Sequence, residues 1–477
     1  MKRASGVLMH ISSLWGDYKI GSFGSEAKKF IDFLSESGFT YWQTLPFCMP
    51  DECSSPYKSF GAFSGNPYFI DLPTLYNKGL LTEEELLSQK QTSPYLCEFE
   101  SLKIDRLSIL EKASKRFNDF DSLNAFYKQN AEVYKFCEFM AIKKSNNSLP
   151  HNEWTVFTPD QNELKKWLFI EYEFFTEWLE IKSYANAKNI KIIGDMPIYV
   201  DFDSADLYYN KREFMLDDNG NPKLIAGVPP DYFSKDGQLW GNPLYDYSAM
   251  KENGYSWWLN RLDFYKKYFD GVRIDHFRAF QDFYAIKPTE KTAKNGKWIK
   301  GPRTSLINKF KKVKGDFLII AEDLGVITNE VKLLVEKSGF PGMRVLQFGF
   351  LGDENSPHLP HNYIQNSVAY TGTHDNNTLL GYMWENSNDV KNLITDYFGV
   401  ERHKWNESYD QIIRQMLSSS AGLTIFPIQD LLKYGADTRL NTPGVSSNNW
   451  AFRITKTAID GIDTSNLNRI NKLYGRK

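Results

Sequence analysis

The segment YFDGVRIDHFR (residues 268–278) places an arginine and a carboxylate at the end of an apolar stretch. In an extended strand, Val272 and Ile274 share one face while Arg273 and Asp275 share the other, so the two charged side chains project together. A neighbouring guanidinium keeps a carboxylate ionised at neutral pH. An ionised, positioned aspartate is suited to act as a covalent nucleophile. A structural ion pair with a helix cap is the alternative interpretation of this strand taken alone.

Two further carboxylates follow apolar stretches. Glu322, in the segment AEDLG, shares its face with Leu318 and Ile320. A carboxylic acid that emerges among apolar neighbours has a raised pKa, which suits a general acid. Asp375 follows His374 in the segment THDNN. A capping carboxylate or a loop network would explain either residue alone, but not three carboxylates at three strand ends.

Paired carboxylates of this kind indicate sugar chemistry. One ionised and one protonated carboxylate on either side of a glycosidic bond are the working groups of a retaining glycosidase. A third carboxylate can bind the sugar hydroxyls and favour a distorted, oxocarbenium-like ring. We therefore predict that Asp275, Glu322 and Asp375 act on one glycosidic bond.

Composition narrows the class of partner. The 477 residues include 57 basic and 59 acidic residues, for a net charge of −2, so we expect neither nucleic acid nor an anionic membrane as a partner. Aromatic residues make up 15% of the chain, which suits stacking against sugars. No GxGxxG, P-loop or zinc-ligand spacing occurs, and we expect no cofactor and no metal.

The cysteines and the N-terminus bear on the compartment. Cys48, Cys53, Cys97 and Cys137 lack C-x-x-C spacing, which favours reduced thiols. The apolar run near the N-terminus is too short for a signal peptide, and no stretch is long enough to span a membrane. We expect a soluble, cytoplasmic protein.

The fold follows from eight short apolar stretches, each ending in polar or charged residues and separated by helical patterns. They lie at residues 6–11, 41–47, 190–200, 271–277, 316–325, 344–350, 367–375 and 422–430. Near-continuous apolar strands alternating with helices are typical of a parallel sheet that is covered on both faces. Eight of them predict an α/β fold of the (β/α)8 (TIM barrel) type, with the polar strand ends lining the catalytic face.

Spacing along the chain predicts where this barrel, taken over residues 1–477, carries insertions. Residues 74–155, after the second strand, have helical periodicity and predict an inserted helical subdomain. Residues 201–262, after the third strand, are rich in glycine, proline and aromatic residues and predict a loop-rich insertion. The lysine-rich residues 287–314 are interpreted as a solvated loop and helix.

Four segments resemble the four sequence regions of the α-amylase clan of glycoside hydrolases: GDMPIYV (194–200), GVRIDHFRAF (271–280), AEDLG (321–325) and GTHDNNT (372–378). The residues in these segments are similar to those of the 4-α-glucanotransferases called amylomaltase or disproportionating enzyme. Four more segments also fit that family: residues 55–72, 227–247, 339–350 and 439–453. The resemblance therefore covers nearly the whole chain.

The resemblance implies a role for nine residues. The catalytic residues would be Asp275 as nucleophile, Glu322 as general acid/base and Asp375 as transition-state stabiliser. The residues that fix the sugar next to the scissile bond would be Asp195, Arg273 and His374. Those that line the glucan path would be Tyr57, Gln238 and Trp240. The substrates would be α-1,4-glucans, such as maltooligosaccharides, starch or glycogen, with glucose or maltodextrin as acceptors.

Two departures from the wider clan are informative. Tyr199 and Val200 stand where amylases carry an Asn-His pair associated with calcium, so no calcium is expected. The chain also ends soon after the eighth strand, and we expect no C-terminal β-sandwich.

Two other functions stay open. An α-1,4-glucan hydrolase of the same clan differs only in whether water or a sugar resolves the glycosyl-enzyme. Residues 227–247 and 55–68 favour transfer, since they can exclude bulk water. A non-catalytic glucan-binding barrel is the second alternative, because fold alone does not establish activity.

Overall fold

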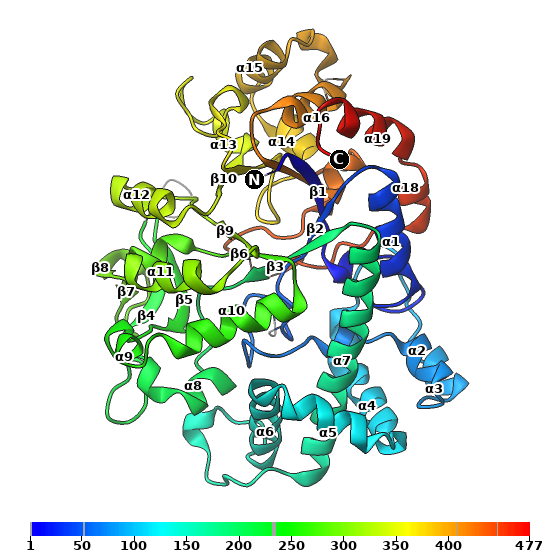
Figure 1. The fold of residues 1–477 in the computed structure, drawn as a ribbon, viewed down its shortest axis with the longest axis vertical. Helices are drawn as coiled ribbons and strands as arrows, with labels where there is room; N and C mark the ends of the chain where they lie inside the picture. Colours follow the sequence, from blue (N-terminus) through cyan, green and yellow to red (C-terminus); the bar gives the residue numbers. More distant parts are fainter. Residues whose placement is uncertain (1, 51–52, 231–234, 408, 446) are drawn as a thin grey trace.

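The computed structural model describes residues 2–50, 53–230, 235–407, 409–445 and 447–477. Eight parallel strands form a closed barrel, in the order β1-β12-β11-β10-β9-β6-β3-β2 (Figure 1). They are β1 (Ala4–Leu8), β2 (Tyr41–Gln43), β3 (Lys191–Met196), β6 (Gly271–Ile274), β9 (Leu318–Ala321), β10 (Gly342–Val345), β11 (Ser367–Tyr370) and β12 (Leu423–Pro427). The predicted (β/α)8 barrel is thus confirmed.

One strand lies earlier in the chain than its apolar stretch predicts. We expected a strand over residues 344–350, but the strand is β10 (Gly342–Val345), and Leu346–Gly349 forms the short helix α13. Leu346 and Gln347 are buried in this turn. A buried helical turn and a buried strand are both continuously apolar, so periodicity does not separate them in so short a run.

Helices cover the barrel, and consecutive members of the following series pack against each other (Figure 1). In that order they are α16 (Tyr409–Ser418), α19 (Thr464–Leu473), α1 (Ser25–Glu36), α7 (Gln161–Ala187), α10 (Ser256–Tyr268), α11 (Thr304–Val313) and α12 (Asn329–Ser338). In the described part of the chain, no helix is both long enough and apolar enough to cross a bilayer.

Five helices lie between β2 and α7: α2 (Leu72–Asn77), α3 (Glu83–Leu87), α4 (Phe99–Arg116), α5 (Phe120–Lys128) and α6 (Ala131–Ser145). Both α4 and α6 pack on α7. At the contact of α6 with α7, the rings of Phe136 and Trp167 meet edge to face with centroids 5.6 Å apart. The boundaries of a separate subdomain over residues 74–155 stay a prediction.

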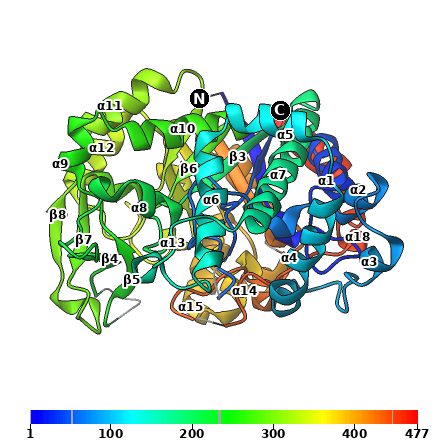
Figure 2. The same ribbon diagram turned by 90° about the horizontal axis from the view of Figure 1, so that it is seen from below.

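A second, antiparallel sheet was not predicted. Its strands run in the order β5-β4-β7-β8. They are β4 (Ile225–Val228), β5 (Gln238–Pro243), β7 (Asp282–Ile286) and β8 (Lys297–Lys300). In both views, this sheet lies at the opposite side of the molecule from α2 and α3 (Figures 1 and 2). Two of its strands fall in residues 201–262 and two beyond, and the boundaries predicted for that insertion stay a prediction.

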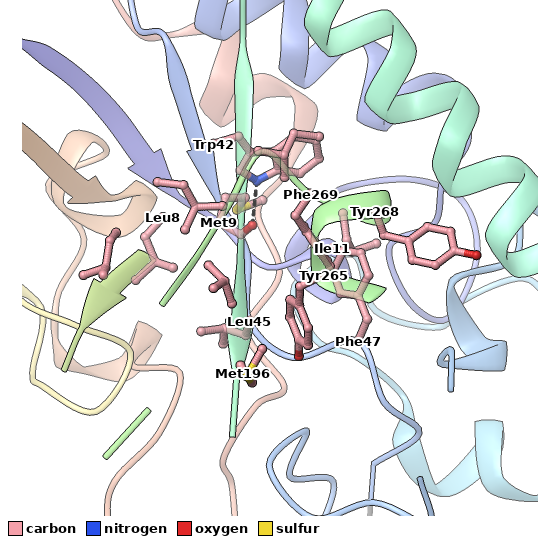
Figure 3. Close-up of a cluster of buried hydrophobic side chains, with 14 of the residues drawn as sticks. Leu8, Met9, Ile11, Trp42, Leu45, Phe47, Met196, Tyr265, Tyr268 and Phe269 are labelled. Atoms are coloured by element: carbon pink, nitrogen blue, oxygen red, sulfur yellow. Dashed lines mark hydrogen bonds between the residues drawn. The ribbon is translucent and has the colours of Figure 1, made fainter. Parts of the chain in front are cut away.

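The core beneath the strand ends is aromatic and closely packed. The indole Nε1 of Trp42 donates a hydrogen bond of 2.8 Å to the carbonyl of Met9, while Phe269 and Met196 pack nearby (Figure 3). From the same cluster, the hydroxyl of Tyr265 donates to the backbone carbonyl of Asp195 at 2.8 Å. The core therefore supports the end of β3, where the predicted site begins.

Candidate active site

The predicted ion pair of Arg273 and Asp275 is present, and it extends to Asp195 on the neighbouring strand. Asp195 of β3 is paired in register with Arg273 of β6. The Arg273 guanidinium donates to both oxygens of Asp195, at 2.8 and 2.9 Å, and lies 3.0 Å from Asp275 Oδ1. Burial disfavours a charged guanidinium, but the two carboxylates outweigh burial and raise the pKa of Arg273. Arg273 therefore stays charged and holds both carboxylates.

Asp275 stands at the end of β6 and caps no helix, since the residue before the turn Phe277–Phe280 is His276 and makes no side-chain capping bond. Its side chain is 27% exposed at the barrel mouth. Burial raises the pKa of Asp275 to about 6, although Arg273 acts in the opposite direction. The sequence predicted an ionised Asp275; the pKa is higher than the ion pair alone implies, because burial exceeds the effect of Arg273.

Glu322 lies at the end of β9, which pairs with β6 so that Ala321 is opposite Ile274. Its two oxygens accept hydrogen bonds from the backbone amides of His276 at 2.6 Å and Leu324 at 2.8 Å. Burial raises the pKa of Glu322 to about 7, and Asp275 raises it further, against the effects of Arg273 and the two amides. Of the two carboxyl groups, Glu322 therefore keeps its proton up to a higher pH than Asp275 does.

Asp375 is held by a distant segment. Asn441 Nδ2 donates to Asp375 Oδ1 at 2.6 Å, and Arg439 donates to the Asp375 carbonyl at 3.1 Å. His374 Nε2 lies 3.4 Å from Asp375 Oδ2. The carboxylate is 45% exposed and thus open to a ligand at the barrel mouth.

The aromatic floor of the site is formed by Tyr57, His374 and Trp450. The Tyr57 hydroxyl donates to Asp195 Oδ2 at 2.7 Å, and its ring stacks on His374 with centroids 5.1 Å apart. The Trp450 ring lies 5.8 Å from Tyr57 and 5.9 Å from His374. Burial and the nearby Asp195 raise the pKa of Tyr57, which therefore stays a hydrogen-bond donor. One face of the Tyr57 ring is already covered by His374.

Strand β5 contributes Gln238 and Trp240. The Trp240 indole donates to Gln238 Oε1 at 3.1 Å, and its ring meets His276 edge to face with centroids 4.9 Å apart. His276 has a left-handed backbone, with φ 46°. Burial lowers the pKa of the His276 imidazole to about 3, and the neutral ring Nε2 has no hydrogen-bond partner among the described residues.

Seven of the nine predicted residues lie at the carboxyl ends of the barrel strands or contact a residue there. Gln238 and Trp240 lie on β5 of the second sheet, where the Trp240 ring contacts His276. Four further residues around the site were given no role from the sequence: His276, Arg439, Asn441 and Trp450. Residues 439–453 were noted only as resembling the family, and the strand analysis of residues 268–278 gave roles to Arg273 and Asp275 but none to His276. Within the described residues, no group of three or more His, Cys, Asp or Glu side chains is arranged to hold a metal ion.

Comparison with known proteins agrees with this geometry. Residues 9–458 match the family model described as 4-alpha-glucanotransferase. A 4-alpha-glucanotransferase from Clostridium butyricum is 40% identical over 98% of this chain and 100% of its own length. One from Streptococcus pneumoniae is 41% identical over 100% of this chain and 98% of its own. The structure of an amylomaltase from Streptococcus agalactiae in complex with acarbose superposes with a TM-score of 0.95 at 37% identity, covering 100% of both chains. The chain therefore belongs to the 4-alpha-glucanotransferase family, as its sequence motifs predicted.

Proposed function

We propose that this protein transfers segments of α-1,4-glucans from a donor to an acceptor glucan or glucose by a retaining double displacement. The observation that carries the proposal is the unequal pair of carboxyl groups on β6 and β9. Asp275 lies against Arg273 at 3.0 Å, whereas Glu322 accepts hydrogen bonds from two backbone amides and has the higher pKa, about 7. Such a difference supplies one ionised nucleophile and one protonated acid at neutral pH.

In the first step, Asp275 attacks the anomeric carbon while Glu322 gives its proton to the leaving glycosidic oxygen. This forms a glycosyl ester on Asp275 and leaves Glu322 as a carboxylate. In the second step, Glu322 takes the proton of an acceptor hydroxyl, which attacks the same carbon and frees Asp275. Two inversions retain the α configuration.

The other groups would bind the sugar at the reacting bond. Asp195, Arg273 and His374 present fixed charges and donors to its hydroxyl groups, and Asp375 stabilises the oxocarbenium-like ring. Tyr57 lines the same position. Because His374 covers one face of its ring, Tyr57 offers an edge, a hydroxyl and at most one ring face to a glucan.

Transfer instead of hydrolysis requires a bound acceptor to outcompete water. Water is present at about 55 M, so a millimolar sugar needs several kcal/mol from orientation and exclusion of water. Trp240 on β5 lies beside His276, whose amide donates to Glu322, and the Trp240 indole donates to Gln238 on the same strand. We propose that Gln238 and Trp240 hold the acceptor sugar and screen the glycosyl-enzyme from water.

The substrates we propose are α-1,4-glucans with maltodextrin or glucose acceptors, without a cofactor. We place the protein in the cytoplasm, because the four cysteines are free thiols in the structure and a reducing compartment keeps thiols in that state.

Maltotriose separates the candidate functions. A transferase yields glucose together with maltopentaose and longer chains, while total reducing ends stay nearly constant, since each broken bond is matched by a new one. A hydrolase instead raises reducing ends in step with substrate loss and forms no longer chains. A binding protein leaves maltotriose unchanged.

A further inference from the structure

Three buried acidic side chains hold one segment of the chain by its backbone. This segment, residues 60–71, will be called the anchored segment; it follows Tyr57 in the sequence. From α7, Glu171 Oε2 accepts from the amide of Gly65 at 2.8 Å, and Glu177 Oε2 accepts from the amide of Asp71 at 2.8 Å. Acidic residues are rarely buried without a partner, so this arrangement calls for a reason.

The third acidic side chain comes from helix α8 (Ala205–Tyr209). Asp206 Oδ2 accepts from the amide of Ala62 at 2.6 Å, and its Oδ1 accepts from the indole of Trp257 at 3.2 Å. The amide of Ala205 in turn donates to the Phe60 carbonyl at 2.8 Å. Both ends and the middle of the anchored segment are therefore attached to α7 and α8.

The two glutamates of the anchor make no other hydrogen bond among the described residues. Glu171 and Glu177 are both buried, and their second oxygens have no hydrogen-bond partner within the part of the chain that the structure describes. Between them on α7, the carboxylate of Glu173 is paired differently: Lys78 donates to it at 2.6 Å. Glu171 and Glu177 therefore serve the anchored segment, whereas Glu173 serves an ion pair.

Packing leaves the anchored segment little freedom. A Cβ at Gly65 would lie 2.2 Å from the Phe174 ring of α7, and a Cβ at Gly61 would lie 2.6 Å from the Phe136 ring of α6. Such approaches are possible only for glycine. The backbone thus lies directly on the two helices, and its position is set by them.

The anchored segment leads directly to the site. Three residues before it, Tyr57 donates to Asp195 and stacks on His374, two residues that flank the reacting bond. We propose that Glu171, Glu177 and Asp206 are positioning residues, which fix Tyr57 against Asp195 and His374 by holding the backbone of residues 60–71. This inference rests on the proposed function, because it concerns the sugar position of the same site.

The chemistry of the anchor predicts which substitutions it tolerates. Burial raises the pKa of Glu171 well above its ordinary range and thereby favours its neutral form. Glutamine resembles a neutral carboxyl group in shape and keeps an acceptor oxygen, whereas leucine fills the space without an acceptor. Glu171→Gln is expected to keep kcat/KM for maltotriose within about twofold, and Glu171→Leu to lower it by about tenfold or more.

A double-mutant cycle with Tyr57→Phe tests whether the effect passes through Tyr57. In a protein that already carries Tyr57→Phe, adding Glu171→Leu should lower kcat/KM by less than about threefold relative to Tyr57→Phe alone. The matched control is Glu173→Leu, on the same helix but outside the anchor, whose effect should be the same in both backgrounds. If the effects of Glu171→Leu and Tyr57→Phe simply multiply, the positioning role is wrong.

Amide hydrogen exchange supplies a readout that needs no turnover. Exchange at Gly65 should rise about tenfold or more in Glu171→Leu and stay unchanged in Glu173→Leu. Unchanged exchange at Gly65 would overturn this inference alone, whereas a wild-type protein without transfer activity would contradict the proposed function. If Glu171→Leu does not fold, Asp206→Asn replaces it in the cycle. Ala62 and Trp257 donate to different oxygens of Asp206, and asparagine replaces one of these acceptors with an NH2 group.

Discussion

The two sides of the active site are held in place by different means. On the strand side, Asp195 and Arg273 lie within paired barrel strands and bind each other. Glu322 directly follows β9 and accepts from the amide of His276, just beyond the neighbouring strand β6. On the loop side, Tyr57 and Asn441 enter from segments whose supports lie far away in the chain. The groups proposed for bond breaking thus stand on the rigid scaffold, and the groups that shape the sugar path stand on anchored loops.

The C-terminal loop shows how such a segment is secured. The backbone amide of Cys97 donates to the carbonyl of Ala451 at 2.7 Å, and the amide of Arg453 donates to the carbonyl of Tyr95 at 2.9 Å. The segment with Asn441 and Trp450 is thus attached to the chain just before α4. Changes on the strand side should therefore abolish the chemistry, and changes on the loop side should adjust it.

The largest effect is expected from the strand side. Asp275→Asn and Glu322→Gln should each lower kcat for maltotriose at least about 1,000-fold, because nucleophile and acid act as one unit. The fold should persist, which circular dichroism and the melting temperature will verify. Activity within tenfold of the wild type in either variant would contradict the roles assigned to these residues.

The two variants should also differ from each other. A glycosyl fluoride has a good leaving group and needs little help from an acid, so Glu322→Gln should still react with it and accumulate a covalent adduct on Asp275. Mass spectrometry of a peptic digest locates the adduct. An adduct on another residue would reassign the nucleophile.

The pH profile should show the inequality of the two carboxyl groups. Activity requires ionised Asp275, so kcat/KM should fall as the pH drops through about 6. Activity also requires protonated Glu322, so kcat/KM should fall again as the pH rises through about 7. The two groups interact, and the measured values belong to the pair. The optimum is expected between these values.

A glycosyl fluoride donor provides the control for this profile. Since its first step does not depend on the proton of Glu322, the alkaline fall in kcat/KM should disappear while the acid fall remains. An alkaline fall that is equal for maltotriose and the fluoride would assign it to a group other than Glu322.

The strand side was also the side that the sequence predicted well. The alternation of side chains along a strand places Arg273 and Asp275 on the same face, and the apolar stretch before them places both at a strand end. Both signals are local in the sequence, so they could be recognised without the structure. The contact of Asn441 with Asp375 joins residues 66 positions apart, and no periodic pattern in the sequence indicates it. Resemblance marked the segment around Asn441, but no physical pattern in it indicated a partner.

The second sheet escaped prediction for a related reason. Strand β8 is largely exposed and β5 has a single buried residue, so both lack the apolar runs that revealed the barrel strands. In β8, lysines at both ends gave the stretch the character of a solvated charge run. Only its pairing with β7, from Asp282↔Lys300 to Ala285↔Lys297, makes it a strand.

A smaller effect is expected on the loop side. Asn441→Ala removes the hydrogen bond of 2.6 Å to Asp375 Oδ1. A hydrogen bond to a charged group contributes about 1.5 kcal/mol or more, so kcat should fall roughly tenfold. The fall should be smaller than for Asp275→Asn, because Asp375 itself remains.

The control for this variant lies in the same segment. The Asn449 side chain accepts from the amide of Thr442 at 2.9 Å and donates to the Val445 carbonyl at 2.7 Å. Among the described residues, it makes no hydrogen bond to Asp375. Asn449→Ala should lower kcat less than Asn441→Ala does. Equal losses would mean that both act through the shape of the loop.

The smallest effect is expected from removing metal ions. Tyr199 and Val200, at the place of the calcium-associated pair of the wider clan, are both buried. The Tyr199 ring stacks on Tyr245 with centroids 6.0 Å apart, and the Val200 carbonyl accepts from Asn242 at 3.0 Å. An aromatic ring and an occupied carbonyl are poor replacements for the oxygen ligands that calcium needs. Dialysis against EDTA should therefore leave kcat unchanged and the melting temperature within about 2 °C, as measured by calorimetry with and without added calcium. A larger shift that added calcium reverses would contradict this prediction.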